Sequence, residues 1–345
     1  MGGETRGKMV ELWEESKPYL FLTLNQLCLS GFMIIVEALF SDGVNGFAFV
    51  VYEHAISTVF LSLLAFFLER RPTFTLKVAS YAFLLALFQV VLCQMLMTVA
   101  LDYISSTYES IGLNLVPSIV FILALVFGQE KLSFATMNGY AKVCGLAFSA
   151  AAAVAIVLWK GPVIFKVLLS DGLQGTSYAV IGGIMVVIGI LATSFWNITV
   201  AHVVKIYPAE LSLTAIMNFF GTIQTAIIAM ALVPSSSWKF EWNGGLTLIA
   251  LSLGGIVVTG LSYYVMAWSI KKKGPVFTTA FNPLLVIFSF LLQTFVLGSS
   301  VHLGSVVGAV FVVAGLYLLL WAKSRDTKKD VTIGDTSACY PLIEP

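Results

Sequence analysis

Apolar runs, each about as long as a bilayer is thick, follow one another along most of the chain, and short polar segments separate them. A membrane-crossing helix needs about 20 mostly apolar residues. Ten runs meet this requirement, and the pattern therefore predicts an all-α membrane protein with ten transmembrane helices. The predicted spans are Tyr19–Phe40, Gly46–Leu68, Val78–Leu101, Ser106–Phe127, Asn138–Trp159, Tyr178–Val200, Glu210–Val233, Leu246–Trp268, Pro275–Leu297 and His302–Trp321.

The basic residues between these spans predict the orientation. Lys and Arg collect on the cytoplasmic side of short membrane loops. If the N-terminus is cytoplasmic, 15 of the 19 Lys and Arg residues fall on cytoplasmic segments and 3 fall outside. One span more or fewer would destroy this bias, so we expect both termini in the cytoplasm.

Composition excludes several other classes of protein. The chain is 59% apolar and only 11% charged, whereas an ordinary soluble domain has roughly 25% charged residues. A net charge of +1 provides no basic surface for nucleic acid. The His and Cys residues lack metal-site spacing, so we predict no metal or cofactor. Walker, HExxH and GxSxG motifs are absent from the sequence, which argues against ATP-driven transport and against an intramembrane enzyme.

The two halves of the chain resemble each other. Each fourth span carries an amide near a proline, Asn114 with Pro117 and Asn282 with Pro283. Each fifth span ends in Leu-Trp followed closely by Lys, after a residue pair ending in Gly. Because five is odd, the second block would run through the membrane inverted, as in many secondary transporters. The alternative is chance similarity between apolar segments.

This repeat gives the predicted domain organisation. Residues 1–18 form a cytoplasmic N-terminus, and residues 19–159 form the first five-span repeat. A linker loop at 160–177 leads to the second repeat at 178–322. The tail, 323–345, is polar without an apolar period and is expected to be disordered in the cytoplasm.

The stretch Lys271–Leu292 combines three lysines, Gly274-Pro275 and a long apolar run interrupted by Asn282-Pro283. Irregular backbone at membrane depth persists only against protein or a water-filled cavity. The interruption therefore predicts one wall of a solute pathway.

Many short motifs of this chain resemble those of the plant WAT1-related proteins, also called nodulin-21-like or UMAMIT transporters. These are EamA-domain members of the drug/metabolite transporter superfamily. The resemblance covers about residues 17–323. It is carried by Lys17-Pro18-Tyr19, Val51-Tyr52, His54-Ala55, Phe67-Leu68-Glu69-Arg70, Glu130-Lys131, Lys160-Gly161-Pro162, Tyr207–Thr214, Gly260–Tyr264, Lys273–Phe277, Ala280–Leu284, and Gly315-Leu316-Tyr317 before Trp321.

The resemblance implies a ten-helix transporter with two EamA repeats and a central cavity lined mainly by spans one, three, four, six, eight and nine. It implies export or facilitated movement of amino acids, with auxin and related metabolites in some branches. The chain departs from the family pattern at Glu53, where Arg is usual. Near the end of span one it has Glu37, where the family often has a basic residue. It also has Ser299 where the second repeat usually has Glu.

Amides and aromatic residues within the spans are candidates for the solute pathway. An amide can accept from an ammonium and donate to a carboxylate, which suits a zwitterion. We favour Gln94, Asn114 and Asn282, with Pro117 and Pro283 freeing backbone groups near two of them. The alternative role for an amide is hydrogen bonding between helices. Two adjacent aromatic residues could stack on an apolar solute, Tyr263 and Tyr264.

Four ionisable residues are candidates for a gate or proton site, because membrane-embedded ionisable groups are costly and tend to be functional. Glu53 and His54 lie in span two, where a structural hydrogen bond is the favoured alternative. Glu37 and Glu109 lie near the outer edge of spans one and four, where an interfacial carboxylate is the favoured alternative.

These observations predict a secondary transporter that moves amino acids or related small metabolites by alternating access. The alternatives are an auxin or other metabolite transporter of the same fold, and a membrane sensor that does not transport. The expected partners are a small-molecule solute and the lipid bilayer, with Gly304 and Gly308 suited to close helix packing inside the protein or in a homodimer. The plasma membrane is favoured over the vacuolar membrane.

Overall fold

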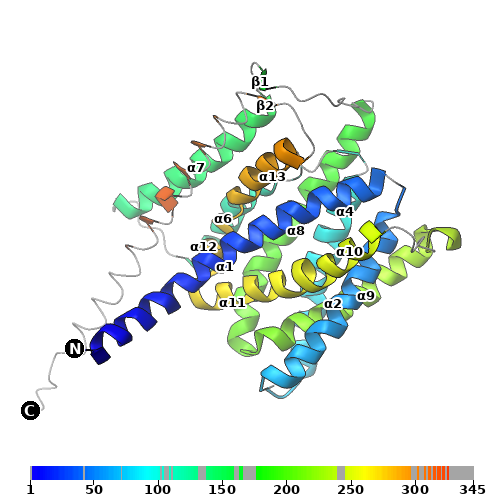
Figure 1. The fold of residues 1–345 in the computed structure, drawn as a ribbon. Helices are drawn as coiled ribbons and strands as arrows, with labels where there is room; N and C mark the ends of the chain where they lie inside the picture. The colour runs from blue at the N-terminus through cyan, green and yellow to red at the C-terminus, as the bar shows by residue number, and fades with distance from the viewer. Residues whose placement is uncertain are drawn as a thin grey trace, which may run out of the picture.

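A computed structural model describes the fold over residues 2–41, 43–70, 72–101, 103–104, 109, 112–130, 137–158, 163–165, 176–238, 245–296 and 301–302, with scattered positions from 307 to 325. Within these residues the protein is a bundle of long apolar helices (Figure 1). Most of the predicted linker, the predicted tail and much of the predicted tenth span lie outside the described residues.

The helices of the first half overlap the predicted spans. They are α1 (Gly2–Ser41), α2 (Gly46–Leu68), α3 (Leu76–Ala86), η1 (Leu87–Met95), α4 (Leu96–Ala100), α6 (Val116–Val126) and α7 (Met137–Leu158). The third span is one continuous rod in three parts, because η1 is a π-helical segment between α3 and α4. Helix α1 begins well before the predicted first span, so part of the polar N-terminal segment is also helical.

The second half has α8 (Thr176–Ile206), α9 (Glu210–Leu232), α10 (Gly245–Leu253), the π-helical η3 (Gly254–Ser262), α11 (Tyr263–Lys273), α12 (Pro275–Thr279) and α13 (Pro283–Val296). A 3-10 turn, η2 (Ser235–Trp238), follows α9. Two short strands, β1 (Val163–Phe165) and β2 (Val301–His302), pair antiparallel. The described fold is otherwise helical.

Seven helical segments in the described part of the chain are long and apolar enough to cross a membrane. They correspond to predicted spans one, two, three, six, seven, eight and nine. Helix α6 lies within the predicted fourth span but is shorter, and α7 covers the predicted fifth. The all-α membrane fold is thus confirmed, with seven candidate spans rather than ten among the described residues.

The predicted interruption of span nine is present in the structure. Helix α11 ends at Lys273, Gly274 adopts a φ of 89° that favours glycine, and Pro275 begins α12. A turn over residues 280–282 then separates α12 from α13. Pro283 has no N–H to donate to the Thr279 carbonyl, which instead accepts from the Asn282 N–H at 3.0 Å.

Helix packing joins the two halves of the chain. Helix α2 lies along α9, and α1 lies along α13 (Figure 1). Helix α8 packs against both η1 and α6. In the same way α3 packs against α9, while α2 packs against η3. The bundle is therefore one interleaved unit in which elements of one half mostly contact elements of the other.

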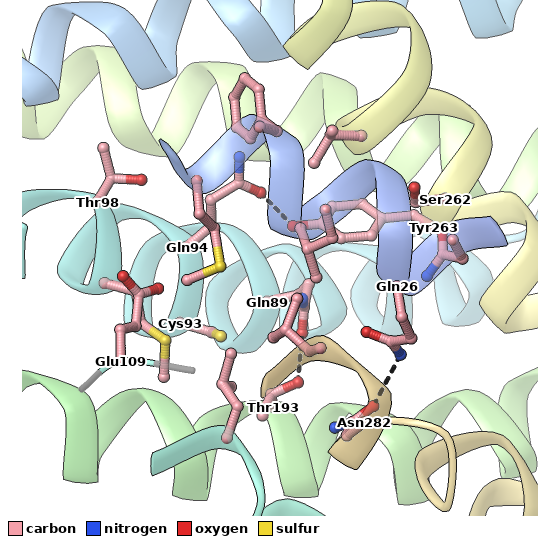
Figure 2. Close-up of a pocket in the computed structure, with 18 of the residues that line it drawn as sticks. Gln26, Gln89, Cys93, Gln94, Thr98, Glu109, Thr193, Ser262, Tyr263 and Asn282 are labelled. Atoms are coloured by element: carbon pink, nitrogen blue, oxygen red, sulfur yellow. Dashed lines mark hydrogen bonds between the residues drawn. The ribbon is translucent and has the colours of Figure 1, made fainter. Parts of the chain in front are cut away.

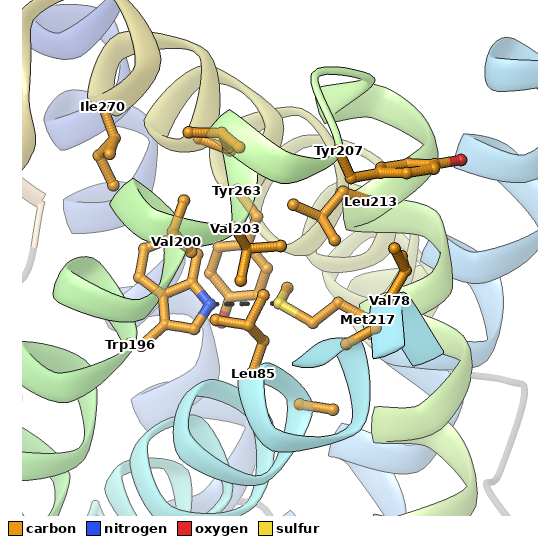
Figure 3. Packing of buried hydrophobic residues seen from close by; sticks show 14 of the residues in the cluster. Val78, Leu85, Trp196, Val200, Val203, Tyr207, Leu213, Met217, Tyr263 and Ile270 are labelled. Carbon is orange, nitrogen blue, oxygen red and sulfur yellow. Dashed lines mark hydrogen bonds between the residues drawn. The ribbon is translucent and has the colours of Figure 1, made fainter. Parts of the chain in front are cut away.

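A large apolar cluster holds spans three, six, seven and eight together (Figure 3). Trp196 of α8 is 1% exposed, and its ring centre lies 6.0 Å from that of Tyr263. The Trp196 indole N–H also donates to the Met217 sulfur at 3.2 Å. Between membrane helices such contacts stabilise by close van der Waals packing, and here they hold Tyr263 against α8.

Polar contacts tie several helix ends together at one end of the bundle. The Glu69 carboxylate, just after α2, accepts the backbone N–H groups of Leu211 and Ser212 at 3.2 and 2.6 Å. These are first-turn donors of α9 that lack partners within the helix. Lys271 of α11 forms an ion pair with Glu210 of α9, so α2, α9 and α11 meet at this end.

Candidate functional site

A cavity of about 120 Å³ lies inside the bundle. A single water needs only roughly 10–15 Å³ measured in this way, so the space suits a small solute. Its walls come from spans one, three, four, six, eight and nine, the six that the family resemblance implies. The polar lining residues are Asn25, Gln26, Gln89, Gln94, Thr98, Glu109, Thr193, Ser262, Tyr263 and Asn282 (Figure 2).

The two π-helical segments supply much of this polar lining. Gln89 and Gln94 belong to η1, and Ser262 ends η3. A π-helix widens the helical turn locally and is frequent at functional sites. The third and eighth spans therefore share both an irregular backbone and a place in the cavity wall.

A hydrogen-bonded chain runs from the cavity to a buried carboxyl group. The Tyr263 hydroxyl donates to the Gln94 side-chain oxygen, and the Gln94 amide donates to Glu53 Oε2 at 2.8 Å. Thr259 of η3 donates to Glu53 Oε1 at 2.5 Å. Glu53 itself is fully buried behind the cavity wall, so Gln94 connects it with the cavity.

The backbone of η3 makes room for this carboxyl group. A methyl group added at Gly254 would lie 2.8 Å from Glu53 Oε1 and 2.8 Å from the Phe32 ring. A Cβ carbon does not approach other atoms so closely unless something is displaced. Gly254 is thus the residue that lets span eight pack directly against Glu53.

At another part of the cavity, an amide pair connects α1 with the turn before α13. Gln26 Nε2 donates to Asn282 Oδ1 at 3.2 Å (Figure 2). Gln26 is 3% exposed, yet its Oε1 has no hydrogen-bond partner in the described structure. Between these ends, Thr193 of α8 donates to Gln89 Oε1 at 3.0 Å. Among the described residues, the cavity wall therefore has at least one hydrogen-bond acceptor without a partner.

Glu109 is the one carboxylate among the described lining residues. It lies with Thr98 at the end of the cavity away from Gln26 and Asn282 (Figure 2). Its side chain is buried, and Oε2 has no hydrogen-bond partner among the described groups. The cavity wall therefore holds an acidic group that sequence reasoning had placed more readily at the membrane surface.

The other predicted residues lie around the cavity rather than in it. Asn114 is fully buried beyond the lining, and both of its amide atoms lack described partners. Tyr264 packs against an apolar cluster of α2 and α9. His54 Nδ1 bonds to the Val50 carbonyl of its own helix at 3.0 Å. The two prolines lie at helix starts, Pro117 in α6 and Pro283 in α13. Glu37 is half-buried near the cavity but is not among its lining residues.

Several lining residues were missed by sequence reasoning. Asn25 and Gln26 are consecutive amides in the first apolar run, a signal that the sequence did contain. Thr98, Thr193 and Ser262 gave no such signal, because hydroxyls are common in membrane helices and often bond to their own backbone.

Comparison with known proteins adds independent information. Residues 17–158 match the model of the EamA-like transporter family. The chain is 34% identical to the WAT1-related protein At5g64700 of Arabidopsis thaliana over 91% of this chain and 92% of that protein. It is 32% identical to the WAT1-related protein At2g37460 of the same plant, over 98% of this chain and 91% of that protein. A solved crystal structure with 14% identity superposes with a TM-score of 0.58 over 87% of this chain and 98% of that one, which establishes similarity of fold alone.

Proposed function

Since the chain belongs to the WAT1-related family of EamA-type membrane transporters, we propose that it moves amino acids or similar small metabolites by alternating access. The observation that carries this proposal is the cavity inside the bundle, with walls from both halves of the chain. Its amides and hydroxyls can accept from an ammonium group and donate to a carboxylate. Its apolar walls, among them Phe32, Met97 and Leu285, suit an uncharged side chain.

The proposal includes two inverted five-helix repeats and ten transmembrane helices. In an inverted repeat, each span of the first half has its counterpart five spans later. The contact between spans one and nine (α1 and α13) then corresponds to the contact between spans six and four (α8 and α6). Both contacts are present. The same correspondence relates the packing of α3 on α9 to that of η3 on α2. The π-helical segments of spans three and eight are related in the same way. Such exchangeable contacts provide two alternative gates in inverted-repeat transporters.

We further propose that both termini are cytoplasmic. The basic end of α11 lies beside the N-terminal part of α1, where Lys272 Nζ is 3.4 Å from Glu14 Oε2. This contact between the lysine-rich loop and the N-terminal segment supports the proposal, as does the distribution of basic residues. Tags at each end should be labelled by impermeant reagents only after the cells are permeabilised. Labelling of one terminus in intact cells would contradict the ten-span topology.

Flux measurements test the function directly. The purified full-length protein is reconstituted in proteoliposomes and tested with a panel of labelled amino acids and with indole-3-acetate, which represents the auxin alternative. We expect saturable flux of at least one amino acid above protein-free vesicles. A solute that binds but does not cross would instead favour a sensor.

Location is also part of the proposal, and the plasma membrane is favoured over the vacuolar membrane. A fluorescent fusion expressed in plant cells distinguishes the two. At the plasma membrane, efflux of preloaded amino acids from cells expressing the protein would indicate an exporter or facilitator.

A further inference from the structure

We propose that the Glu109 end of the cavity is a binding site for a protonated amine, with the Glu109 carboxylate as the main acceptor. The transported solute would then bind with its amine toward Glu109. The link to transport depends on the function proposed above, whereas amine binding by the purified protein does not.

The geometry around Glu109 supports this assignment. The residue is 6% exposed and lines the cavity, and Oε2 has no hydrogen-bond partner in the described part of the chain. A buried polar group without a partner is costly, and a buried charge without a partner is more so. A ligand that donates charged N–H groups would remove this cost.

A second carboxylate increases the preference for a cation. Glu37 of α1 interacts electrostatically with Glu109, and Glu37 Oε2 is also buried without a described hydrogen-bond partner. Among the described residues, no Lys or Arg lines the cavity or pairs with either carboxylate. Two acidic side chains therefore lie in or near this end of the cavity, and no basic side chain of the described structure pairs with either.

A second polar atom in the cavity wall is also a hydrogen-bond acceptor. The buried Gln26 Oε1 and Glu109 Oε2 are both acceptors that no described residue pairs with. Both are satisfied by N–H or O–H donors and not by another carboxylate. We therefore infer selectivity for solutes with a protonated amine, either zwitterionic or cationic, and discrimination against solutes whose only charge is a carboxylate. This would disfavour the auxin alternative.

Three probes with the same isobutyl tail test the inference. They are leucine, 3-methylbutylamine, which lacks the carboxylate, and 4-methylpentanoate, which lacks the amine. Binding to the purified full-length protein is measured by calorimetry or by thermal shift, and leucine flux is measured separately in proteoliposomes. We expect leucine and the amine to bind and the carboxylate to bind at least tenfold more weakly.

Variants at Glu109 identify the site. Glu109→Gln should weaken binding of leucine and of the amine roughly 10- to 100-fold, as expected for loss of a charged hydrogen bond. Glu109→Asp, which keeps the charge, should recover part of this affinity. Glu15→Gln, at an exposed carboxylate of α1, is the matched control and should change nothing.

The outcomes separate the two proposals. Equal binding of amine and carboxylate by the wild-type protein, binding of none of the probes, or unchanged amine affinity in Glu109→Gln would overturn the amine site. Glu109-dependent amine binding without flux of any amino acid would leave the amine site standing and overturn the transport proposal. If Glu109→Gln does not fold, the wild-type preference among the three probes and the Glu109→Asp variant still decide.

Discussion

The Gln26 side-chain amide donates to Asn282 Oδ1 at 3.2 Å and so joins two residues that lie 256 positions apart in the sequence. One belongs to the first span, and the other forms the turn between α12 and α13. Their helices are joined again by Ser30 and Ser289, whose hydroxyls are 3.1 Å apart. Because both amides line the cavity, a change in the α1–α13 contact would change the cavity as well.

Asn282→Leu should abolish solute flux. Leucine has nearly the same size but removes the acceptor of the Gln26 amide and one polar group of the cavity wall. Gln224→Leu is the matched control, because its amide donates to the Phe83 carbonyl outside the cavity. That control should retain flux and lose about 0.6 kcal/mol of stability, as for an average hydrogen bond between membrane helices.

Both variants are compared with wild type in proteoliposomes that contain the same amount of protein. Normal flux in Asn282→Leu would remove this residue from the pathway. Loss of flux in Gln224→Leu to the same extent would indicate a general effect of removing a buried amide.

The sequence predicted the irregular ninth span well, because its signals are local. Gly274 and Pro275 can adopt few conformations, and Pro283 cannot continue the hydrogen bonding of a helix. The same applies to the apolar runs, whose length alone indicates a bilayer span.

Contacts between distant segments could not be predicted in the same way. The sequence marked Glu53 and Gln94 as separate candidates, but only helix packing shows that they bond to each other and to Thr259. The π-helical turns of η1 and η3 decide which side chains face the cavity, and no residue pattern in the two segments announces them. Glu109 was expected near the membrane edge, and its position along the run could not show that its side chain lines a cavity. Its burial depends on the neighbouring helices.

Thr259→Val should destabilise the protein by about 1–3 kcal/mol, since it leaves Glu53 Oε1 buried without its 2.5 Å donor. Valine keeps the shape of threonine, so little packing is lost. Thr225→Val is the control, because this equally buried hydroxyl bonds to the Gly221 carbonyl of its own helix at 2.8 Å. The two variants are compared by thermal unfolding in detergent. Equal melting temperatures of the two variants would mean that the Thr259–Glu53 bond stabilises the protein no more than the hydroxyl bond of Thr225 does.

Gly254→Ala should lower stability and flux together. The new methyl group would meet Glu53 Oε1 and Phe32 at 2.8 Å, and overpacking of this kind typically costs about 1–3 kcal/mol. Gly183→Ala in α8 is the opposite case, because no described atom outside its own stretch of helix lies within 4 Å of the added methyl group. It should leave the melting temperature unchanged or raise it, since alanine favours helix by about 0.5–1 kcal/mol over glycine. A Gly254→Ala protein as stable and active as wild type would show that span eight can move away from Glu53 without cost.

Glu69→Ala should weaken the junction between α2 and α9 and thereby alter transport kinetics. Its carboxylate accepts two otherwise unpaired N–H groups at the start of α9, at 3.2 and 2.6 Å, as a helix-capping residue does. Loss of such a cap costs about 0.5–2 kcal/mol, and Glu69→Asp should recover little of it because the shorter side chain cannot reach both donors. Glu15→Ala removes an exposed carboxylate of α1 and serves as the control.

If the α2–α9 junction closes one end of the cavity in alternating access, Glu69→Ala should change the exchange rate of a transported solute while its binding affinity at Glu109 stays the same. Calorimetry and exchange in proteoliposomes separate these quantities, and a variant with wild-type exchange would show that the cap has no part in gating.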